Sequence, residues 1–411
     1  MVRYKPYERY KYSGVEWIGE IPEHWEVKKI KRIAQLKSGE SITSLNINDE
    51  GDFPVYGGNG VRGYTTNYTH DGRFVVIGRQ GALCGNINYA IGKFWASEHA
   101  VVASPRGSYQ TIWFGELLRV MNLNQYSTAA AQPGLAVEQI INLAIPVPPD
   151  SEQQTISVIL DRKTSEIDGL IADKEKLASL LQEYRQAIIS EAVTKGLNPD
   201  VKMKDSGVEW IGEIPEHWEV NRVKYLLREI DERSMTGNED LLSVSQYYGI
   251  RPRETVTEKV ARADSLVGYK LCKQGDVVIN KMLAWQGALG HSKFDGIVSP
   301  DYTVIRTFEA VCSRYIAYLF KTPIYTTEFT KESKGIIPSR WRLHMESLGR
   351  IYSLVPPFSE QQAIADHLDQ KTSEVDDLIS GIQESIAQLK SYRQSLISEA
   401  VTGKIDVRGV I

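Results

Sequence analysis

Apolar residues recur at alternating three- and four-residue steps in two long segments of the chain. In the first segment they are Leu160, Ile167, Leu170, Leu177, Leu181, Tyr184 and Ile188, and in the second Leu368, Val375, Leu378, Leu389, Tyr392 and Leu396. This heptad-like spacing predicts a long helix that packs on a partner helix. Because Lys163 and Lys174 interrupt the series, the pairing is not an ideal zipper. The first helix, from Glu152 to Thr194, would be ~64 Å long.

Both predicted helices have the same start and stop signals. A Pro-Pro pair precedes Ser151 and Gln154, which fit the S-x-x-Q capping box, and Ser359 and Gln362 repeat the pattern. Gly196 and Gly403 follow the last apolar residues and are the expected helix ends.

The stretches before each long helix have a different pattern, with short β-branched runs between glycine-rich turns. These runs predict strands at 74–78, 100–104, 276–280 and 302–306. Short helices are expected at Ile112–Met121 and Ser313–Phe320. The fold class is therefore α+β, with two globular β-rich domains separated by two long antiparallel coiled-coil-like helices.

The chain consists of two copies of one unit. Ser13–Val27 and Ser206–Val220 both read SGVEWIGEIPEHWEV, and Pro148–Thr194 closely resembles Pro356–Thr402. A fainter likeness relates the RQGALCG segment from Arg79 to the WQGALG segment from Trp285. The repeat predicts six parts: copied segment 1–27, recognition domain 28–147, helical spacer 148–196, linker and copied segment 197–220, recognition domain 221–357 and helical spacer 358–411.

Charge is divided between these parts. The formal net charge of the chain is −4, yet residues 28–147 carry +3, residues 221–357 carry +5 and the rest −12. A basic domain on an acidic scaffold is typical of a surface that binds a polyanion such as DNA.

Signatures of an enzyme are absent from the sequence. It has no phosphate loop, no dinucleotide fingerprint, no nucleophile elbow and no HExxH zinc motif. Pro300-Asp301 lacks the E-x-K that would complete a nuclease signature, and a tight turn explains Gly57–Gly60 better than a phosphate cradle. His24 and His217 lie in the copied segment, which favours a structural role. We expect no catalytic, cofactor or metal site.

Neither the cysteines nor the apolar runs indicate a secreted or membrane protein. The three cysteines are far apart and form no CxxC motif, so no disulfide framework or zinc site is expected. The N-terminus is basic and tyrosine-rich, and no apolar run approaches the ~20 residues of a membrane span. The expected location is the cytoplasm.

Two similar domains on antiparallel helices predict a reader of bipartite DNA, in which each domain contacts one half-site through the major groove. A ~64 Å rod spans at most ~19 base pairs. Candidate readers are polar, basic and aromatic residues at the turns: Tyr56, Asn59, Arg62, Arg79, Gln80, Tyr247, Arg251, Arg253, Lys281, Gln286, Arg340 and Arg342. Trp285 and Trp341 suit packing, and Trp17, Trp25, Trp210 and Trp218 suit pins between helix and domain. The alternative is a two-domain coiled-coil adaptor for partners other than nucleic acid.

The chain resembles the specificity subunits of type I restriction–modification systems. The likeness rests on the duplicated GEIPEHWEV segment, the PPxSEQQ helix start, the KTSExDxLI and YRQxxISEAVT stretches, and the YGGNG and GRQGALCG turns. It implies two target recognition domains, helices that dock two methyltransferase subunits, and restriction subunits that translocate and cut DNA. S-adenosylmethionine, ATP and Mg are then expected in those partner subunits, and this chain is expected to be non-catalytic.

Overall fold

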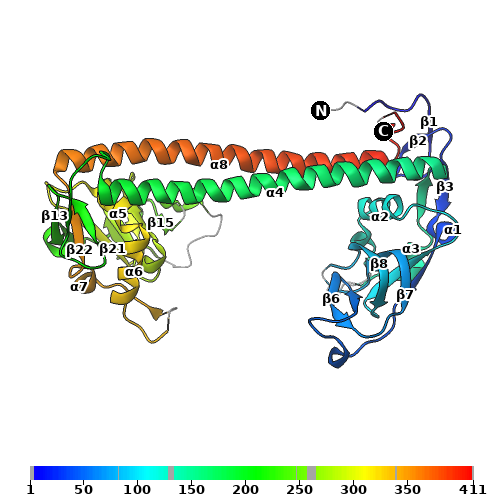
Figure 1. Cartoon of the computed structure of the whole chain (residues 1–411), viewed down its shortest axis with the longest axis horizontal. Coiled ribbons are helices and arrows are strands. Elements are labelled where there is room, and N and C mark those ends of the chain that lie inside the picture. The colour runs from blue at the N-terminus through cyan, green and yellow to red at the C-terminus, as the bar shows by residue number, and fades with distance from the viewer. Residues whose placement is uncertain are drawn as a thin grey trace. The chain divides into compact units, whose positions relative to one another are not determined.

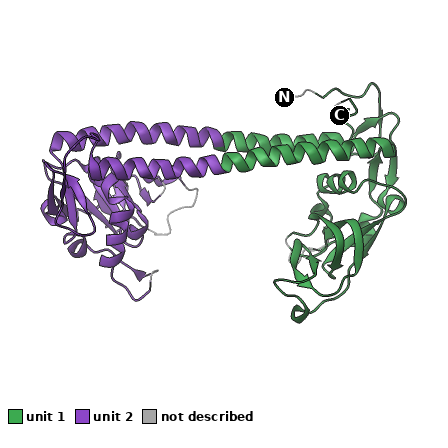
Figure 2. Cartoon of the chain, viewed as in Figure 1, with its two compact units in different colours: residues 1–175, 383–411 green, residues 176–382 purple. Residues whose placement is uncertain are grey.

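The structure is a computed structural model that describes residues 4–81, 83–127, 134–246, 248–256, 265–337 and 340–409. The chain divides into two compact units (Figure 2): unit 1 comprises residues 1–175 and 383–411, and unit 2 comprises residues 176–382. Each unit contains one β-rich domain and one segment of each long helix (Figure 1). The expected α+β class is thereby confirmed.

The two long helices are α4, Asp150–Lys195, and α8, Phe358–Val401. Both end where glycine was expected to end them, because Gly196 and Gly403 adopt positive φ angles of 81° and 73°. That left-handed backbone conformation costs glycine little, and it stops a helix.

The helix starts differ from the predicted capping box. Ser151 lies inside α4, and the side chain that secures the first turn is Gln153 rather than Gln154. Gln153 Nε2 donates to the carbonyl oxygen of Pro148 at 3.0 Å. Gln361 makes the same bond to Pro356 at 2.8 Å in α8. Because Nε2 donates, each bond ties the Pro-Pro segment to the helix start, but it does not cap the free backbone N–H groups as Ser151 was expected to do.

The buried stripe on the long helices is also displaced from the predicted seam. Leu160, Ile167, Leu368, Val375 and Leu396 are buried as expected, whereas Leu170, Leu177, Tyr184 and Leu378 are about half exposed. Buried apolar positions further along the helices are instead Ile171, Ile189, Val193, Ile379, Ile386 and Ile397. An α-helix drifts ~20° per heptad relative to a strict seven-residue repeat, so the buried face moves to neighbouring positions.

Ion pairs link the two helices in each unit. In unit 1, Asp168 pairs with Arg393 at 2.8 Å, and Glu175 pairs with Lys390 at 3.4 Å. Since the α4 numbers rise while the α8 numbers fall, the two segments run antiparallel. In unit 2, Arg185 pairs with Asp376 at 2.9 Å, which repeats the Asp168–Arg393 pair 208 residues along the chain.

A six-stranded sheet forms the domain of unit 1, in the order β4-β9-β7-β8-β5-β6. All neighbours are antiparallel except β5 and β8. Its strands are β4 Ala34–Ser38, β5 Phe53–Gly57, β6 Gly60–Thr65, β7 His70–Gly78, β8 Ile87–Ala96 and β9 Ala100–Pro105. Around it lie β1 Tyr10–Tyr12, β2 Glu20–Pro22, β3 Glu26–Lys29, α1 Ile30–Ile33, α2 Thr111–Val120, α3 Val137–Ile140 and β10 Ala144–Val147, with 3-10 turns Ser44–Asn46 and Leu123–Tyr126.

The domain of unit 2 has a four-stranded antiparallel sheet in the order β14-β21-β18-β19. These strands are β14 Leu227–Ile230, β21 Tyr302–Thr307, β18 Val277–Asn280 and β19 Leu289–His291. Four strand pairs flank it, formed by β11 Met203–Asp205 with β12 Glu213–Pro215, β13 Glu219–Arg222 with β22 Tyr352–Val355, β15 Leu242–Ser245 with β16 Gly249–Pro252, and β17 Lys270–Cys272 with β20 Gly296–Val298. The short helices are α5 Ser313–Phe320, α6 Pro323–Glu332 and α7 Met345–Leu348, with 3-10 turns Val223–Tyr225, Arg253–Thr255 and Ala284–Gln286.

The two domains share one frame. The order β4-β9-β7-β8 in unit 1 matches β14-β21-β18-β19 in unit 2. The helix α2 follows β9, and α5 follows β21, which is the matching strand of unit 2. The strands expected from β-branched runs are β7, β9, β18 and β21, and the two expected short helices are α2 and α5, so these predictions are confirmed. The domains differ mainly in the segments inserted between the first and second conserved strands, which form β5–β6 in unit 1 and β15–β17 in unit 2.

The copied segment joins each domain to the start of a long helix. In unit 1, Trp25 is fully buried, and its Nε1 donates to Glu152 at 2.7 Å. His24, Tyr7 and Arg408 also contact this carboxylate, at 2.7, 3.3 and 3.2 Å. These contacts confirm Trp25 as a pin and His24 as a structural residue.

In unit 2 the carboxylate at the start of the long helix, Glu360, has fewer partners than Glu152. His217 Nε2 lies 2.7 Å from Glu360, and Trp218 Nε1 donates to it at 3.1 Å. Trp210 also packs as expected, in an edge contact with Tyr325. Trp17 does not act as a pin, because it is 36% exposed, although its segment is a verbatim copy.

Candidate nucleic-acid interface

Two loops meet at one edge of the unit 1 sheet. The turn between β5 and β6 packs against the loop that follows β7, so closely that a Cβ on Gly78 would lie 2.0 Å from the carbonyl oxygen of Gly58. A Cβ on Gly58 would in turn lie 3.0 Å from the carbonyl oxygen of Gln80. Only glycine at these positions lets the two backbones come together. The YGGNG and GRQGALCG motifs therefore form one surface.

Side chains of the two loops fix one another at this surface. Asn86 donates to the Asn59 side-chain oxygen at 2.6 Å. Gln80 Oε1 lies 2.8 Å from His99 Nδ1, and the other ring nitrogen of His99 lies 3.2 Å from Glu98. Asn86 and His99 were not among the predicted readers. The sequence could have pointed to Asn86 only through its place in the loop that carries Arg79 and Gln80. Nothing in the sequence pointed to His99, because it comes from a different segment, the turn before β9.

The remaining candidates of unit 1 have different surroundings. Arg62 is exposed on β6. Arg79 is half-buried, and its backbone N–H donates to His99. Tyr56 is packed edge-on against Phe94 and donates its hydroxyl to the Tyr89 carbonyl at 3.0 Å. Burial raises the pKa of Tyr56.

The matching loop in unit 2 runs from β18 to β19. Lys281 directly follows β18 as Arg79 directly follows β7, and Gln286 matches Gln80 in the repeat. The Lys281 carbonyl accepts the backbone N–H of Leu343 at 3.0 Å, which brings the 340–343 segment beside this loop. Trp285 and Trp341 then meet edge to face, with ring centroids 5.7 Å apart. The two rings therefore pack against each other, as the packing interpretation predicts.

Three predicted readers surround that tryptophan pair. Gln286 and Arg340 are exposed, and Arg342 is half-buried with its guanidinium donating to the Trp341 carbonyl at 2.9 Å. Lys281, Gln286, Arg340 and Arg342 thus gather at one place, although about 55 residues separate the two segments in sequence.

A second group lies on the β15–β16 hairpin of unit 2. Arg251 is exposed on β16, and Arg253 begins the 3-10 turn that follows. The Nε of Arg253 is buried and has no hydrogen-bond partner in the part of the chain that the structure describes. Tyr247 lies outside the described residues.

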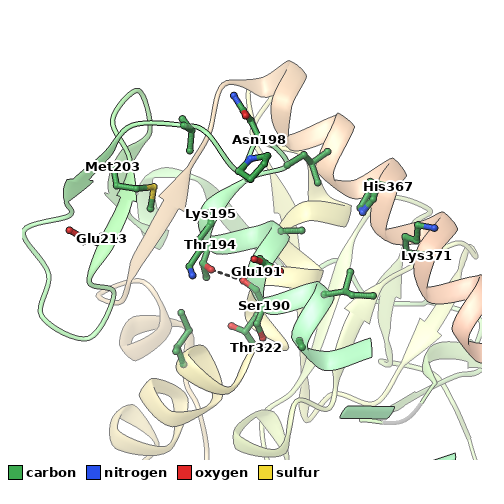
Figure 3. A pocket seen from close by; sticks show the side chains of 18 of the residues that line it. Ser190, Glu191, Thr194, Lys195, Asn198, Met203, Glu213, Thr322, His367 and Lys371 are labelled. Atoms are coloured by element: carbon green, nitrogen blue, oxygen red, sulfur yellow. Dashed lines mark hydrogen bonds between the residues drawn. The ribbon is translucent and has the colours of Figure 1, made fainter. Parts of the chain in front are cut away.

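A groove of about 1350 Å³ lies in unit 2 beside the copied segment (Figure 3). The last turns of α4 form one wall, and His367 and Lys371 project from α8 on another side. Glu191, Lys195 and Glu213 line it as well, so its polar groups have both signs. It has no excess of either charge and is not a site for a polyanion.

The described residues hold no group of three or more His, Cys, Asp or Glu side chains placed to bind a metal ion. Cys84, Cys272 and Cys312 are all free and buried. Among the helices of the described part, none is long and apolar enough to cross a membrane.

Comparison with known proteins agrees with the repeat and the fold. A family model described as the type I restriction modification DNA specificity domain matches residues 22–177. The EcoprrI specificity subunit of Escherichia coli is 42% identical over 139 residues, which are 33% of this chain and 35% of that protein. A putative type I restriction enzyme specificity subunit of Haemophilus influenzae is 23% identical over 403 residues, which are 94% of this chain and 96% of that protein.

Solved structures share the fold over nearly the whole chain. A chain from a structure of complex assembly and conformational transition in the type I R-M system has a TM-score of 0.69 at 15% identity, covering 94% of this chain and 99% of that one. The HsdS subunit from Thermoanaerobacter tengcongensis has a TM-score of 0.54 at 15% identity, covering 94% and 98%.

Proposed function

We propose that the chain is a specificity subunit of a type I restriction–modification system and that it reads an asymmetric bipartite DNA target, with one half-site for each domain. The observation that carries this proposal is the pair of matched loops. Both follow the same strand of a shared four-stranded frame, after β7 and after β18, yet apart from the shared glutamine, Gln80 and Gln286, their polar side chains differ. A conserved frame with different polar loops suits two readers of two different sequences.

We propose that exposed and half-buried polar side chains at these turns read the bases. In unit 1 these are Asn59, Arg62 and Gln80, with Arg79 behind them, and Tyr56 supports the turn because its ring and hydroxyl are already engaged. In unit 2 the proposed readers are Lys281, Gln286, Arg340 and Arg342 beside the tryptophan pair, and Arg251 and Arg253 on the hairpin segment. Tyr247, which lies outside the described residues, stays a candidate reader. Arg and Lys suit guanine edges, and Asn and Gln suit adenine.

The long helices are proposed to dock two methyltransferase subunits, with restriction subunits completing the complex. Leu177, Leu180 and Tyr184 on α4 are 48%, 50% and 56% exposed, and a row of exposed apolar side chains is typical of a protein–protein contact. The chemistry, with S-adenosylmethionine, ATP and Mg, would lie in those partners. This chain itself would be a non-catalytic subunit that acts in the cytoplasm.

The helices are further proposed to set the gap between the half-sites. The 46 residues of α4 correspond to ~69 Å, which limits the unread gap to roughly 20 base pairs. Inserting two heptads at matching positions of α4 and α8 should widen the gap and leave both half-sites unchanged.

Methylome sequencing of cells with and without the gene tests the proposal. A bipartite methylated motif should depend on the gene, and replacing residues 28–147 with another recognition domain should change one half-site only. The matched control replaces residues 221–357 and should change the other half. If no motif depends on the gene, or if one replacement changes both halves, the reading mechanism is wrong.

Binding of the purified chain to duplex DNA separates this function from an adaptor role. Retention at low salt should weaken steeply as salt is added, since neutralised phosphates release counterions. An adaptor for other partners would show no retention.

A further inference from the structure

The cavity between the unit 2 domain and the long helices has an unusual excess of positive charge. It measures about 470 Å³ and is lined by five Lys or Arg side chains and one acid, Asp369. The five cations come from four parts of unit 2, namely α4, β16, the segment after β19, and the α5 region. The five positive charges therefore meet in one cavity and are not spread over an open surface.

Acidic partners neutralise only two of these cations. Arg314 pairs with Asp366 at 2.8 Å and with Asp369 at 2.7 Å, and Arg185 pairs with Asp376 at 2.9 Å. The remaining three are Arg251, Lys293 and Lys321. Within the part of the chain that the structure describes, no acidic side chain forms an ion pair with any of these three.

The Lys321 side chain is the least compensated of them. Burial, and to a smaller extent the Arg185 guanidinium, lower the pKa of Lys321 to about 8, whereas Asp376 opposes the shift. The ammonium group lies beside the backbone of Gly249, where a Cβ would be 3.5 Å from Nζ. A half-buried lysine among other cations costs free energy unless an anion joins it.

Unit 1 has a corresponding cavity in which the charges are more nearly balanced. Gln153 Oε1 accepts the backbone N–H of Gln110, and Gln361 Oε1 accepts that of Cys312, so α2 and α5 dock identically on their helices. By this correspondence, the residues of unit 1 that match Tyr318 and Lys321 are Glu116 and Arg119. That cavity measures about 340 Å³ and is lined by three arginines and two acids, with Arg119 paired to Glu116 at 3.1 Å. The excess of charge is therefore particular to unit 2.

We propose that the unit 2 cavity binds a phosphate group through Arg251, Lys293 and Lys321. Arg251, one of the candidate readers, would then contact the phosphate instead of a base. Tetrahedral oxyanions accept several charge-assisted hydrogen bonds at once, and both Arg and Lys supply them. The phosphate can belong to the backbone of bound DNA or to a free phosphate compound. The site does not depend on the proposed reading of DNA, which only one arm of its test uses.

Chemical labelling of the full chain tests this site without any variant. Acetic anhydride at pH 8 acetylates lysines, and mass spectrometry measures the modification of Lys321 alone and with inorganic pyrophosphate or a 30-base-pair duplex. Protection of at least five-fold is expected with one or both, compared with sodium chloride of equal ionic strength. Protection by duplex alone identifies a DNA phosphate, and protection by pyrophosphate alone identifies a free phosphate compound. Without protection by either, the proposal is overturned.

Two variants provide a second measurement. Pyrophosphate should raise the melting temperature of the wild-type chain, and Lys321→Met should lose most of that rise. Arg119→Met is the matched control in unit 1 and should keep it. An equal rise in wild type and Lys321→Met would contradict the site. If pyrophosphate protects Lys321 while the chain binds no DNA, the phosphate site stands and the proposed function fails.

Discussion

The junctions between domain and long helices in the two units share a frame and differ in charge. Gln153 and Gln361 make the same bonds, and the pair Asp168–Arg393 repeats as Asp376–Arg185. Around this common set, unit 1 places Glu116 against Arg119. Unit 2 has Tyr318 and Lys321 in their places, without that carboxylate. Duplication thus preserved the residues that join domain to helix, and the variable residues beside them acquired a different electrostatic role.

The largest expected effect concerns the carboxylate at the start of each long helix. Glu152 has contacts to Trp25, His24, Tyr7 and Arg408 and is 8% exposed at its side chain, so Glu152→Ala should destabilise unit 1 by about 3 kcal/mol. The loss leaves the Trp25 N–H buried without an acceptor. Chemical unfolding, monitored by circular dichroism, measures this loss of stability.

Glu360→Ala is the matched variant in unit 2. Glu360 is 27% exposed and has two partners, so roughly half the loss is expected. Glu152→Gln controls for charge, because the amide oxygen can still accept the Trp25 bond. Equal losses for the two alanine variants would mean that the additional contacts of unit 1 contribute nothing.

Local patterns in the sequence predicted most of the shared frame. The strands at 74–78 and 302–306 follow from β-branched runs that can be buried on both faces, and Gly196 ends its helix through a conformation that few other residues adopt. The repeat itself predicted that the loops after β7 and β18 would have matching places. These features depend on residues close together in sequence.

Features that depend on tertiary packing escaped prediction. Leu170 fits the heptad spacing as well as Ile171 does, and only the packing partners decide which is buried. Tyr56 has the polarity of a reader, yet its hydroxyl is bound to Tyr89 on a neighbouring strand. Likewise, His99 joins Gln80 only because β7 and β9 are neighbours in the sheet. No local pattern contains that information.

Exchanging the charge at the two junctions should exchange their anion binding. Tyr318→Glu places a carboxylate near Lys321, as Glu116 is near Arg119, and should weaken pyrophosphate binding by about ten-fold. Glu116→Gln removes the partner of Arg119 and should give unit 1 a measurable affinity. Isothermal titration of pyrophosphate into the full chain measures both. Unchanged binding in Tyr318→Glu would show that the local charge does not explain the difference between the units.

Replacing Lys321 should stabilise the protein when phosphate is absent. The pKa of Lys321 in the fold, about 8, lies below its ordinary value of 10.5, so the protonated lysine destabilises the fold fully below pH 8. Between those two values the unfolded chain binds more protons, and wild-type stability rises with pH. Lys321→Met should therefore raise the melting temperature at pH 7 by roughly 2–4 °C, and the gain should shrink toward pH 10. A lower melting temperature at pH 7 would show that the lysine stabilises the fold.

The smallest effect is expected from the duplicated ion pair. Arg393→Ala breaks the pair with Asp168 in unit 1, where both partners are at least 30% exposed, so it should cost under about 1 kcal/mol. Arg185→Ala breaks the matching pair, but it also removes a cation that faces Lys321 and frees Asp376 to compensate that lysine. The net loss should therefore be smaller in unit 2. Thermal unfolding of both variants at low and high salt measures the difference. An equal or larger loss for Arg185→Ala would mean that Arg185 and Lys321 do not repel each other.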